Sequence, residues 1–482
     1  MNTFLVLKVV SVLLLVIAGF MVAPIIVAVV MNEASVVPAF LAPMTIVAVV
    51  AGSFLIATRG VRGSLSTKSG FFLVTLSWLS AAAIGALPFT VSGWIPSYAD
   101  AFFESMSGFT TTGATILTDI EGLPASLLFW RSLTHWLGGM GIIVLTVAIL
   151  PLLGVGGYQI MKAEAPGPSV DKLTPKITET AKILWFIYMG LTVLETVLLM
   201  AGGLSLYDAL THTFGTLATG GFSPKDASVG HYTSPFVQIV VTVFMLGAGI
   251  NFILYYRLLM GEHRLITENT EVKAYLGIFV VATAAIAVSL FGRAYATLGE
   301  SVRYAGFQAA SILTTTGYAT ADFAQWPHFA QAVLFALMFV GGSAGSTGGG
   351  MKVVRIVTVV KQGFNEMRYL IHPRGIFQIR LNKRPIRKDV VYSITGLVFL
   401  YITSLVVTSL VVATGGHDIV TSFTTALATL GNIGPGFGGV GPVENYAFYQ
   451  DYIKWFLSLV MMVGRLEIYS VLVLLTPAFW RR

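Results

Sequence analysis

Four short strings of small polar residues recur along the chain, and their backbone carbonyls are the groups that could do chemistry. String 1 is TTTGA (110–114), string 2 is ATGGF (218–222), string 3 is TTTGY (314–318) and string 4 is GNIGP (431–435). Their central glycines, 108, 96 and 117 residues apart, are Gly113, Gly221, Gly317 and Gly434. No string contains a side chain that is ionised at neutral pH. The composition therefore favours coordination of a cation by carbonyl oxygens over a ring of charged side chains.

The predicted filter consists of each central glycine and the two residues before it. Glycine reaches backbone dihedrals closed to other residues, so nearby carbonyls can turn toward a common axis and replace the water around a dehydrated cation. Small residues also help membrane helices to pack, but packing glycines need not recur at one place in every repeat. The predicted filter residues are Thr111, Thr112, Gly113, Thr219, Gly220, Gly221, Thr315, Thr316, Gly317, Asn432, Ile433 and Gly434.

The elements around these strings are predicted to be membrane helices. Of the 482 residues, 55% are hydrophobic and only 11% are charged, whereas soluble domains carry about 25% charged residues. A helix needs about 20 apolar residues to cross a bilayer. Because the chain has no cysteine, disulfides and thiolate metal sites are excluded. Apolar runs of suitable length lie at 4–31, 70–90, 181–201, 274–292, 390–413 and 455–479.

An internal repeat organises these runs. Each string follows a segment too short to span a bilayer, and an apolar run lies on either side. We therefore expect an all-α polytopic membrane protein with four fused helix–pore loop–helix units around one pore, plus two N-terminal transmembrane helices, or ten spans. The expected divisions are the N-terminal helix pair at 1–68 and the pore units at 69–160, 161–265, 266–388 and 389–482.

The stretch GGSAGSTGGG at 341–350 contains six glycines in ten residues, which would badly weaken a helix. It does not fit a phosphate-binding loop, because Met351 separates Gly350 from Lys352 and no Ser or Thr follows. Irregular backbone at membrane depth belongs in a lumen. We predict a gate loop below the filter, in the third unit only; the alternative is a helix break for packing. The predicted gate residues are Gly342, Ser343, Ala344, Gly345, Ser346, Thr347, Gly348 and Arg465.

Arg465 lies in the last long apolar run, where an ionisable residue is costly and usually faces a cavity or a partner. Glu467, two residues away, does not share its helix face. Arg465 is predicted either to stand on the pore axis near the gate loop or to pair with a carboxylate such as Glu104 or Glu195. Arg131 and His135 are predicted to hold a filter loop or to line the pore.

The basic residues indicate the orientation of the chain. Alternating loops on one side contain 23 of the 29 Lys and Arg residues, and the positive-inside rule makes that side, with both termini, cytoplasmic. Ten of these residues lie at 352–388. That segment is expected to contact anionic lipid headgroups, a regulator, or both. The apolar N-terminal run is too long for a signal peptide.

The strings and several longer motifs resemble the Trk/Ktr/HKT superfamily of potassium transporters, and most closely its bacterial TrkH/TrkG branch. The resemblance covers the whole chain. It implies a potassium-permeable pore in the bacterial inner membrane, usually in a homodimer, bound on the cytoplasmic side by a nucleotide-binding ring protein of the TrkA type. The motifs are FFESMSGFTTTGATIL (102–117), WRSLTHWLGGMGIIVLTVAILPLL (130–153), PSVDKLTPKITETA (168–181), GGSAGSTGGGMKVVR (341–355) and VGRLEIYSVLVLLTP (463–477).

The resemblance also implies that Gly113, in place of a serine, accompanies potassium permeation. String 4 departs from the pattern, since Asn432 and Ile433 replace threonines and Pro435 follows Gly434. Proline restricts the residue before it. We therefore expect the four repeats to contribute unequally and discrimination to be looser than in a channel of four identical chains.

The expected function is potassium uptake through the four loops, gated by the glycine-rich loop and a cytoplasmic regulator. K⁺ is the expected transported ion, and neither an organic cofactor nor a nucleic acid partner is expected. The alternative is a sodium- or proton-coupled secondary transporter with broken helices at a midplane site. An enzyme is not expected, because the sequence contains no metal-ligand cluster, nucleophile elbow or spaced carboxylate pair.

Overall fold

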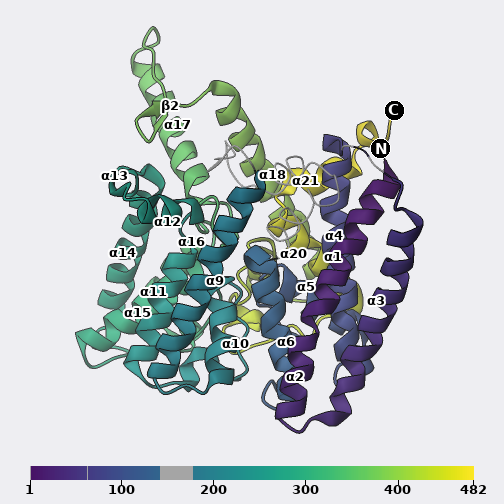
Figure 1. Ribbon diagram of the computed structural model, residues 1–482. Coiled ribbons are helices and arrows are strands. Elements are labelled where there is room, and N and C mark those ends of the chain that lie inside the picture. Colours follow the sequence, from purple (N-terminus) through teal and green to yellow (C-terminus); the bar gives the residue numbers. More distant parts are fainter. Residues whose placement is uncertain (1, 62, 64, 142–176, 482) are drawn as a thin grey trace.

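The computed structural model describes residues 2–61, 63, 65–141 and 177–481 (Figure 1). Within these residues the protein is mostly helical, and its strands are the short antiparallel pair β1 (Arg380–Leu381) and β2 (Arg384–Pro385). The expected all-α class is confirmed. The expected division between residues 160 and 161 lies outside the described residues, and the other divisions stay predictions.

The N-terminal helices lie at one edge of the molecule (Figure 1). Helices α1 and α2 together form a long apolar rod, and α3 packs back against α1. Side chains of α1 and α3 join the hydrophobic core of the first repeat, for example Leu13 and Phe40. These two N-terminal spans therefore flank the repeats rather than interrupting them. The first span consists of α1 (Thr3–Phe20) and α2 (Val22–Val30), and the second contains α3 (Val37–Ala57).

The remaining helices form four repeats of similar order. The first contains α4 (Thr67–Val91), α5 (Tyr98–Phe109) and α6 (Ala125–Trp136). The second contains α9 (Ile177–Ala201), α10 (Leu206–Leu217), α11 (Pro235–Ala248), α12 (Phe252–Leu259) and α13 (His263–Thr267). The third contains α14 (Thr270–Leu290), α15 (Leu298–Leu313), α16 (His328–Leu337) and α17 (Val353–Ile371). The fourth contains α18 (Lys388–Ala413), α19 (Ile419–Leu430), α20 (Asp451–Arg465), α21 (Ile468–Leu472) and α22 (Pro477–Trp480).

The short helix before each string begins at a defined cap. Ser97, Ser205, Thr297 and Asp418 each accept a hydrogen bond from the backbone N–H three residues later. Such side chains satisfy N–H groups that the first helical turn leaves unpaired. Helices α5, α10 and α19 have 12 residues and α15 has 16. At about 1.5 Å per residue, none is long enough to span the roughly 30 Å apolar core of a bilayer.

The long helices match most of the expected spans. Within the described residues, six helices are long and apolar enough to cross a membrane, and two bent pairs raise the number to eight. The other two expected spans correspond to α6, which leads through a π-helical turn (Leu137–Gly141) to residues that are not described, and to α16 with the segment after it. The four-unit layout is thus consistent with ten spans.

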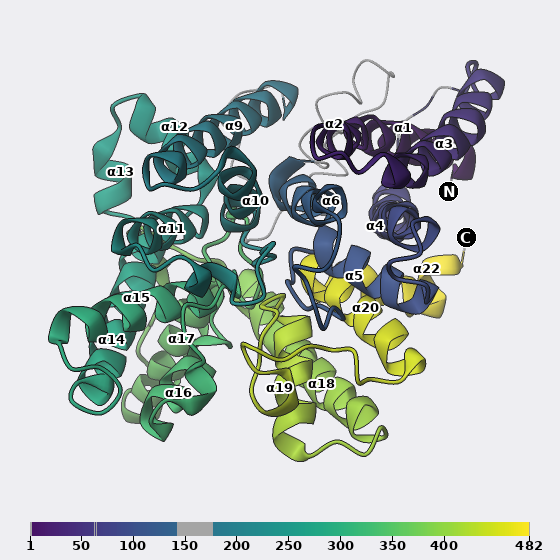
Figure 2. The same ribbon diagram turned by 90° about the horizontal axis from the view of Figure 1, so that it is seen from below.

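The repeats follow one another around a central region (Figure 2). Helix α6 packs on α10, α11 packs on α15, and α20 packs on α5, which closes the circle from the fourth repeat to the first. One buried cluster joins the third and fourth repeats through residues such as Leu334 and Leu427. The hydrophobic cores therefore lie between neighbouring repeats, and the strings lie nearer the centre of the molecule.

Candidate functional site

The four strings adopt one backbone conformation. Thr111, Thr219, Thr315 and Asn432 all have positive φ, between 52° and 59°, which is uncommon for residues other than glycine. The central glycines have φ between 81° and 91°. A conformation repeated at four places shows that the strings are equivalent local structures, even though string 4 has a different sequence.

The glycines show that the strings form a closed ring. A Cβ on Gly113 would collide with the carbonyl oxygen of Gly220, one on Gly221 with that of Thr316, and one on Gly317 with that of Ile433. A Cβ on Gly434 would lie 2.7 Å from the carbonyl oxygen of Thr112. String 1 thus contacts 2, 2 contacts 3, 3 contacts 4, and 4 contacts 1. The structure brings all twelve predicted filter residues together around one axis.

Four threonine hydroxyls of strings 1 and 3 make hydrogen bonds within their own string. Thr110 and Thr112 share a hydrogen bond of 2.8 Å between their side-chain oxygens, and Thr314 and Thr316 share one of 2.7 Å. Both pairs are buried. These four hydroxyls are satisfied in pairs, which leaves the carbonyl oxygens as the groups that strings 1 and 3 turn toward their neighbours. The hydroxyl of Thr111 is buried without a hydrogen-bond partner among the described residues.

String 4 fits the ring despite its departures. Gly434 has a φ of 91°, close to the other three glycines, although Pro435 follows it. Asn432 donates from Nδ2 to Thr112 Oγ1 at 2.9 Å and to the carbonyl of Met461 at 2.9 Å, so its amide ties string 4 to string 1. The Cβ position of Gly434 is less crowded than those of the other three. The strings share a backbone conformation but differ in their lateral contacts.

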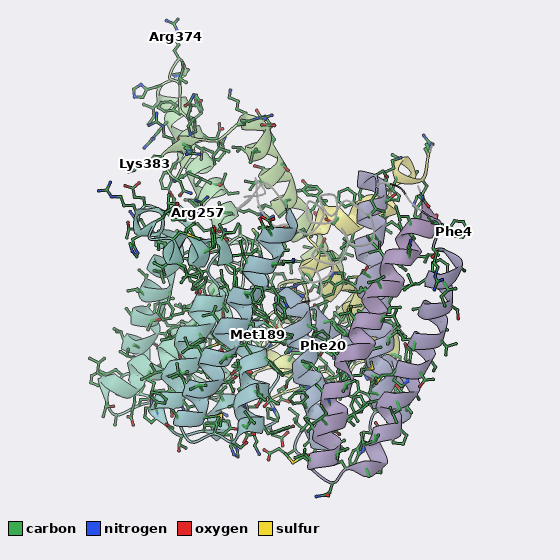
Figure 3. All side chains as sticks on the ribbon, in the orientation of Figure 1. Phe4, Phe20, Met189, Arg257, Arg374 and Lys383 are labelled. Atoms are coloured by element: carbon green, nitrogen blue, oxygen red, sulfur yellow. The ribbon has the colours of Figure 1, made fainter. Side chains whose placement is uncertain are left out.

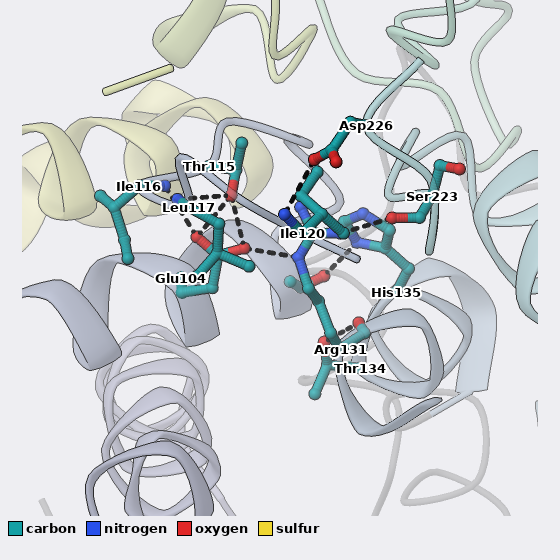
Figure 4. Close-up of polar contacts among 11 residues, drawn as sticks. Glu104, Thr115, Ile116, Leu117, Ile120, Arg131, Thr134, His135, Ser223 and Asp226 are labelled. Carbon is teal, nitrogen blue, oxygen red and sulfur yellow. Dashed lines mark hydrogen bonds and ion pairs between the residues drawn. The ribbon is translucent and has the colours of Figure 1, made fainter. Parts of the chain in front are cut away.

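Arg131 and His135 hold the strings from behind (Figure 4). Arg131 pairs with Glu104 and donates to the carbonyl of Ser223, while His135 Nδ1 lies 2.7 Å from the carbonyl oxygen of Gly108. All of these side chains are buried. Of the two predicted roles, the contacts agree with holding a loop. The sequence predicts Glu104 only as one partner of Arg465, because its pairing with Arg131 depends on a fold that brings α5 and α6 together.

The segment 341–350 is irregular and lies against strings 3 and 4. The N–H of Gly349 donates to Thr315 Oγ1 at 2.6 Å, and a Cβ on Gly349 would lie 2.6 Å from the carbonyl oxygen of Gly431. On the other side, the N–H of Ser343 donates to the carbonyl of Gly249 at 2.8 Å. Residues 342–348 therefore sit between the strings and the bend of the second repeat.

Arg465 contacts this segment directly. Its Nη1 donates to the carbonyl of Thr347 at 2.6 Å, and its Nη2 donates to the carbonyls of Gly138 and Gly139 at 3.0 and 2.9 Å. Glu104, one of the predicted ion-pair partners, pairs with Arg131 instead. Glu467 forms an ion pair with Arg355, in which Oε1 lies 2.6 Å from Nη2. The predicted gate residues from Gly342 to Gly348 and Arg465 thus meet in one place.

The expectation that irregular backbone at this level occurs in the third unit only was wrong. Within the described residues the third repeat has the longest irregular segment, but helices of other repeats also break at this level. Helices α11 and α12 are bent by 96° and α20 and α21 by 118°. The first repeat has its π-helical turn at Leu137–Gly141. A signal was present in the second repeat, since Asn251, which caps α12, comes two residues after a Gly-Ala-Gly run.

The basic segment projects from the helical body. Helix α17 begins at Val353, next to the irregular segment, and leads to the hairpin of β1 and β2. Arg374 marks the far end of this projection, and Lys383 lies nearer its base, where it pairs with Glu268 at 3.0 Å (Figure 3). The segment 352–388 therefore connects the surface to the residues around Arg465.

These features define a class, a multi-pass membrane protein in which four helix–pore loop–helix units enclose one ring of carbonyl-rich strings. The chain belongs to the TrkH family, described as cation transport proteins, which it matches over residues 36–482. The expected family is thereby confirmed.

Relatives and a solved structure resemble the chain over most or all of its length. It is 41% identical to the Trk system potassium uptake protein TrkH of Escherichia coli (strain K12), over 88% of each chain. It is 40% identical to the protein of that name in Halomonas elongata, over all of both chains. Its fold matches the crystal structure of the potassium transporter TrkH from Vibrio parahaemolyticus with a TM-score of 0.88 and 36% identity, over all of both chains.

Proposed function

We propose that the chain carries potassium into a bacterial cell through the ring of strings 1–4. The supporting observation is the cyclic contact of Gly113, Gly221, Gly317 and Gly434 with carbonyl oxygens of neighbouring strings. Rings of backbone carbonyls replace the hydration shell of potassium in selective pores. The relatives in Escherichia coli and Halomonas elongata are named as potassium uptake proteins. K⁺ is the transported ion, and the twelve filter residues coordinate it through their backbone.

Residues 342–348 and Arg465 are the proposed gate. The loop occupies the space beside strings 3 and 4, and Arg465 of the fourth repeat joins it to the first repeat. Ser343 contacts the second repeat. An element held by all four repeats beside a filter obstructs the path sterically, and the guanidinium adds a positive charge that opposes cations. Movement of the loop opens the path.

The segment 352–388 is the proposed docking site of a TrkA-type cytoplasmic ring. Most of it projects from the body, and eight of its ten basic residues lie beyond the buried Lys352 and Arg355. The relatives are named as parts of a Trk system. Movement of this segment would reach the gate through α17. The chain is further proposed to form a homodimer in the inner membrane, with both termini in the cytoplasm.

Flux measurements on the purified protein in liposomes test this function. With an imposed potassium gradient and no proton or sodium gradient, we expect potassium and rubidium to pass faster than sodium. Empty liposomes and liposomes containing Gly113→Ser protein are the controls. Equal rates for all three ions would contradict the filter.

Coupled secondary transport is the second candidate. The bends between α11 and α12 and between α20 and α21 favour it, since broken helices form the binding sites of many coupled transporters. The same liposomes distinguish the two. Potassium flux that disappears unless a proton or sodium gradient is present would indicate coupling, whereas flux driven by the potassium gradient alone indicates a pore.

A further inference from the structure

A buried ion pair lies directly behind strings 1 and 2. Arg131 Nε of α6 is 2.5 Å from Glu104 Oε1 of α5, and the two side chains are 2% and 0% exposed. Removing two charges from water is costly unless the remaining polar groups also find partners. The other contacts of this pair therefore indicate what it does (Figure 4).

Glu104 holds the residues that follow string 1. The hydroxyl of Thr115 donates to Oε1 at 2.9 Å and lies 3.1 Å from Oε2, and the N–H of Ile116 donates to Oε2 at 3.0 Å. Thr115 and Ile116 come two and three residues after Gly113. The carboxylate therefore fixes the direction in which the backbone leaves string 1.

Arg131 extends the same network to string 2. Its Nη1 donates to the carbonyl of Ser223 at 2.9 Å, and its Cζ lies 3.5 Å from the centre of the Phe222 ring. Phe222 also stacks on His135, with ring centres 4.1 Å apart. Phe222 and Ser223 come directly after Gly221. One guanidinium thus contacts string 1 through Glu104 and the end of string 2 itself.

String 2 is held from its other side by string 3. The hydroxyl of Tyr318 donates to the carbonyls of His212 and Phe222 at 3.0 and 3.2 Å. The hydroxyl of Ser223 pairs with His212 Nε2 at 3.0 Å. Arg131 of the first repeat and Tyr318 of the third repeat both contact the end of string 2. The lateral position of string 2 therefore depends on both side chains.

We propose that Arg131 is a positioning residue that sets the spacing of strings 1 and 2 and, through it, the discrimination between potassium and sodium. The proposal rests on the proposed function, because it requires the strings to coordinate the ion. A carbonyl ring distinguishes the two cations by the size of its cavity and by the number and field of its oxygens. Either property changes when one string moves relative to its neighbour. Glu104 aligns the guanidinium and neutralises its charge.

Arg131→Lys is the sharpest test. It keeps a positive charge beside Glu104, but one ammonium cannot take the places of both Nε and Nη1 of the planar guanidinium. We expect folded protein that still carries potassium, with a sodium-to-potassium permeability ratio raised about fivefold, equivalent to about 1 kcal/mol of lost discrimination.

A double variant gives an independent measurement. Arg131→Met combined with Glu104→Gln removes both charges, and so avoids the unpaired buried charge that a single neutral substitution would leave. It should raise the permeability ratio in the same direction. The matched control is Lys225→Met with Glu121→Gln, which removes an exposed ion pair, 3.3 Å long, between the same two repeats. The control should keep the parental ratio.

An unchanged ratio in both folded variants would overturn the proposal. Failure of both to fold would overturn it too, since the pair would then serve folding alone. Gly113→Ser separates this outcome from a failure of the filter. If Gly113→Ser alters the ratio and Arg131→Lys does not, the filter stands and only the role of Arg131 is lost. If Gly113→Ser and Gly317→Ser leave the ratio unchanged as well, the filter assignment also fails.

Discussion

At the scale of single residues, Gly113 is placed where no side chain fits. A Cβ there would collide with the carbonyl oxygen of Gly220, which belongs to the backbone and cannot rotate away. Its φ of 82° adds strain for any other residue. Gly113→Ser should therefore push strings 1 and 2 apart and raise the sodium-to-potassium permeability ratio about tenfold, the effect of about 1.4 kcal/mol. Flux of both ions into liposomes measures it.

Gly317→Ser should act in the same way, because its Cβ would collide with the carbonyl oxygen of Ile433. Gly277→Ser, at a position where a Cβ meets nothing within 4 Å, is the matched control. Parental permeability ratios in both Gly113→Ser and Gly317→Ser would remove the filter assignment.

Arg465 provides the second residue-scale prediction. Arg465→Ala removes the hydrogen bonds to Thr347, Gly138 and Gly139 and a positive charge beside the proposed path. We expect the gate loop to loosen and potassium flux to increase several-fold at equal amounts of folded protein. Lys383→Ala, which removes an exposed lysine of the projecting segment that pairs with Glu268 at 3.0 Å, is the control for loss of a positive charge. Lower thermal stability without any gain in flux would instead assign Arg465 to folding.

The sequence was sufficient to find the glycines and Arg465 because each stands out in the pattern of residues around it. Glycines recur at one place in four repeats, and an arginine stands in an apolar run. The roles of Glu104 and Tyr318 could not be found in that way. Each contacts backbone that the fold brings close, and Tyr318 reaches residues about a hundred positions away in the chain.

At the scale of elements, the capped half-helices direct each string toward the centre. Asp418 begins α19, where the hydroxyl and then the N–H of Thr421 donate to its carboxylate and lower its pKa. Because the pKa is lower in the folded protein, the stabilisation is present above the unfolded value of about 3.9 and is lost as the pH falls through the folded value.

Asp418→Asn should therefore reduce the acid sensitivity of the fold. Asparagine is also a good N-cap, so stability near neutral pH should change little. The melting temperature of the parent in detergent should fall more steeply than that of the variant as the pH drops below about 4. Identical slopes would show that this carboxylate adds nothing specific to the fold.

The half-helices and the strings were predictable because their length and composition differ from those of spanning helices. The bends were predictable only in part. In the third repeat, six glycines predict the break from the sequence. In the fourth repeat, α20 and α21 meet at Leu466 and Glu467, and neither residue type is one that usually breaks a helix. Glu467 has a φ of 62° and pairs with Arg355, so a tertiary contact accompanies this bend.

At the scale of the whole molecule, the four repeats meet twice, once at the strings and once around residues 342–348. Chain order gives the succession of the repeats, but the contact of α20 with α5 that closes the circle comes from the fold. At the second level, Arg465, Thr347, Gly249 and Gly138 bring the four repeats to one loop. A displacement of this loop therefore changes contacts with every repeat.

Deleting residues 343–347 tests whether the loop closes the path. The ends of the deletion already meet, since a Cβ built on Gly342 lies 3.5 Å from the Cα of Gly348, and consecutive Cα atoms are about 3.8 Å apart. The shortened chain can thus rejoin without displacing α16 or α17. It loses the carbonyl of Thr347 that Arg465 holds. We expect potassium flux several-fold above that of the parent and independent of any cytoplasmic partner. Ser343→Ala keeps the length of the loop and removes a hydroxyl that has no hydrogen-bond partner in the described residues, so it should behave as the parent. A deletion variant that folds normally but conducts no better would show that the loop is a packing break and that the gate lies elsewhere.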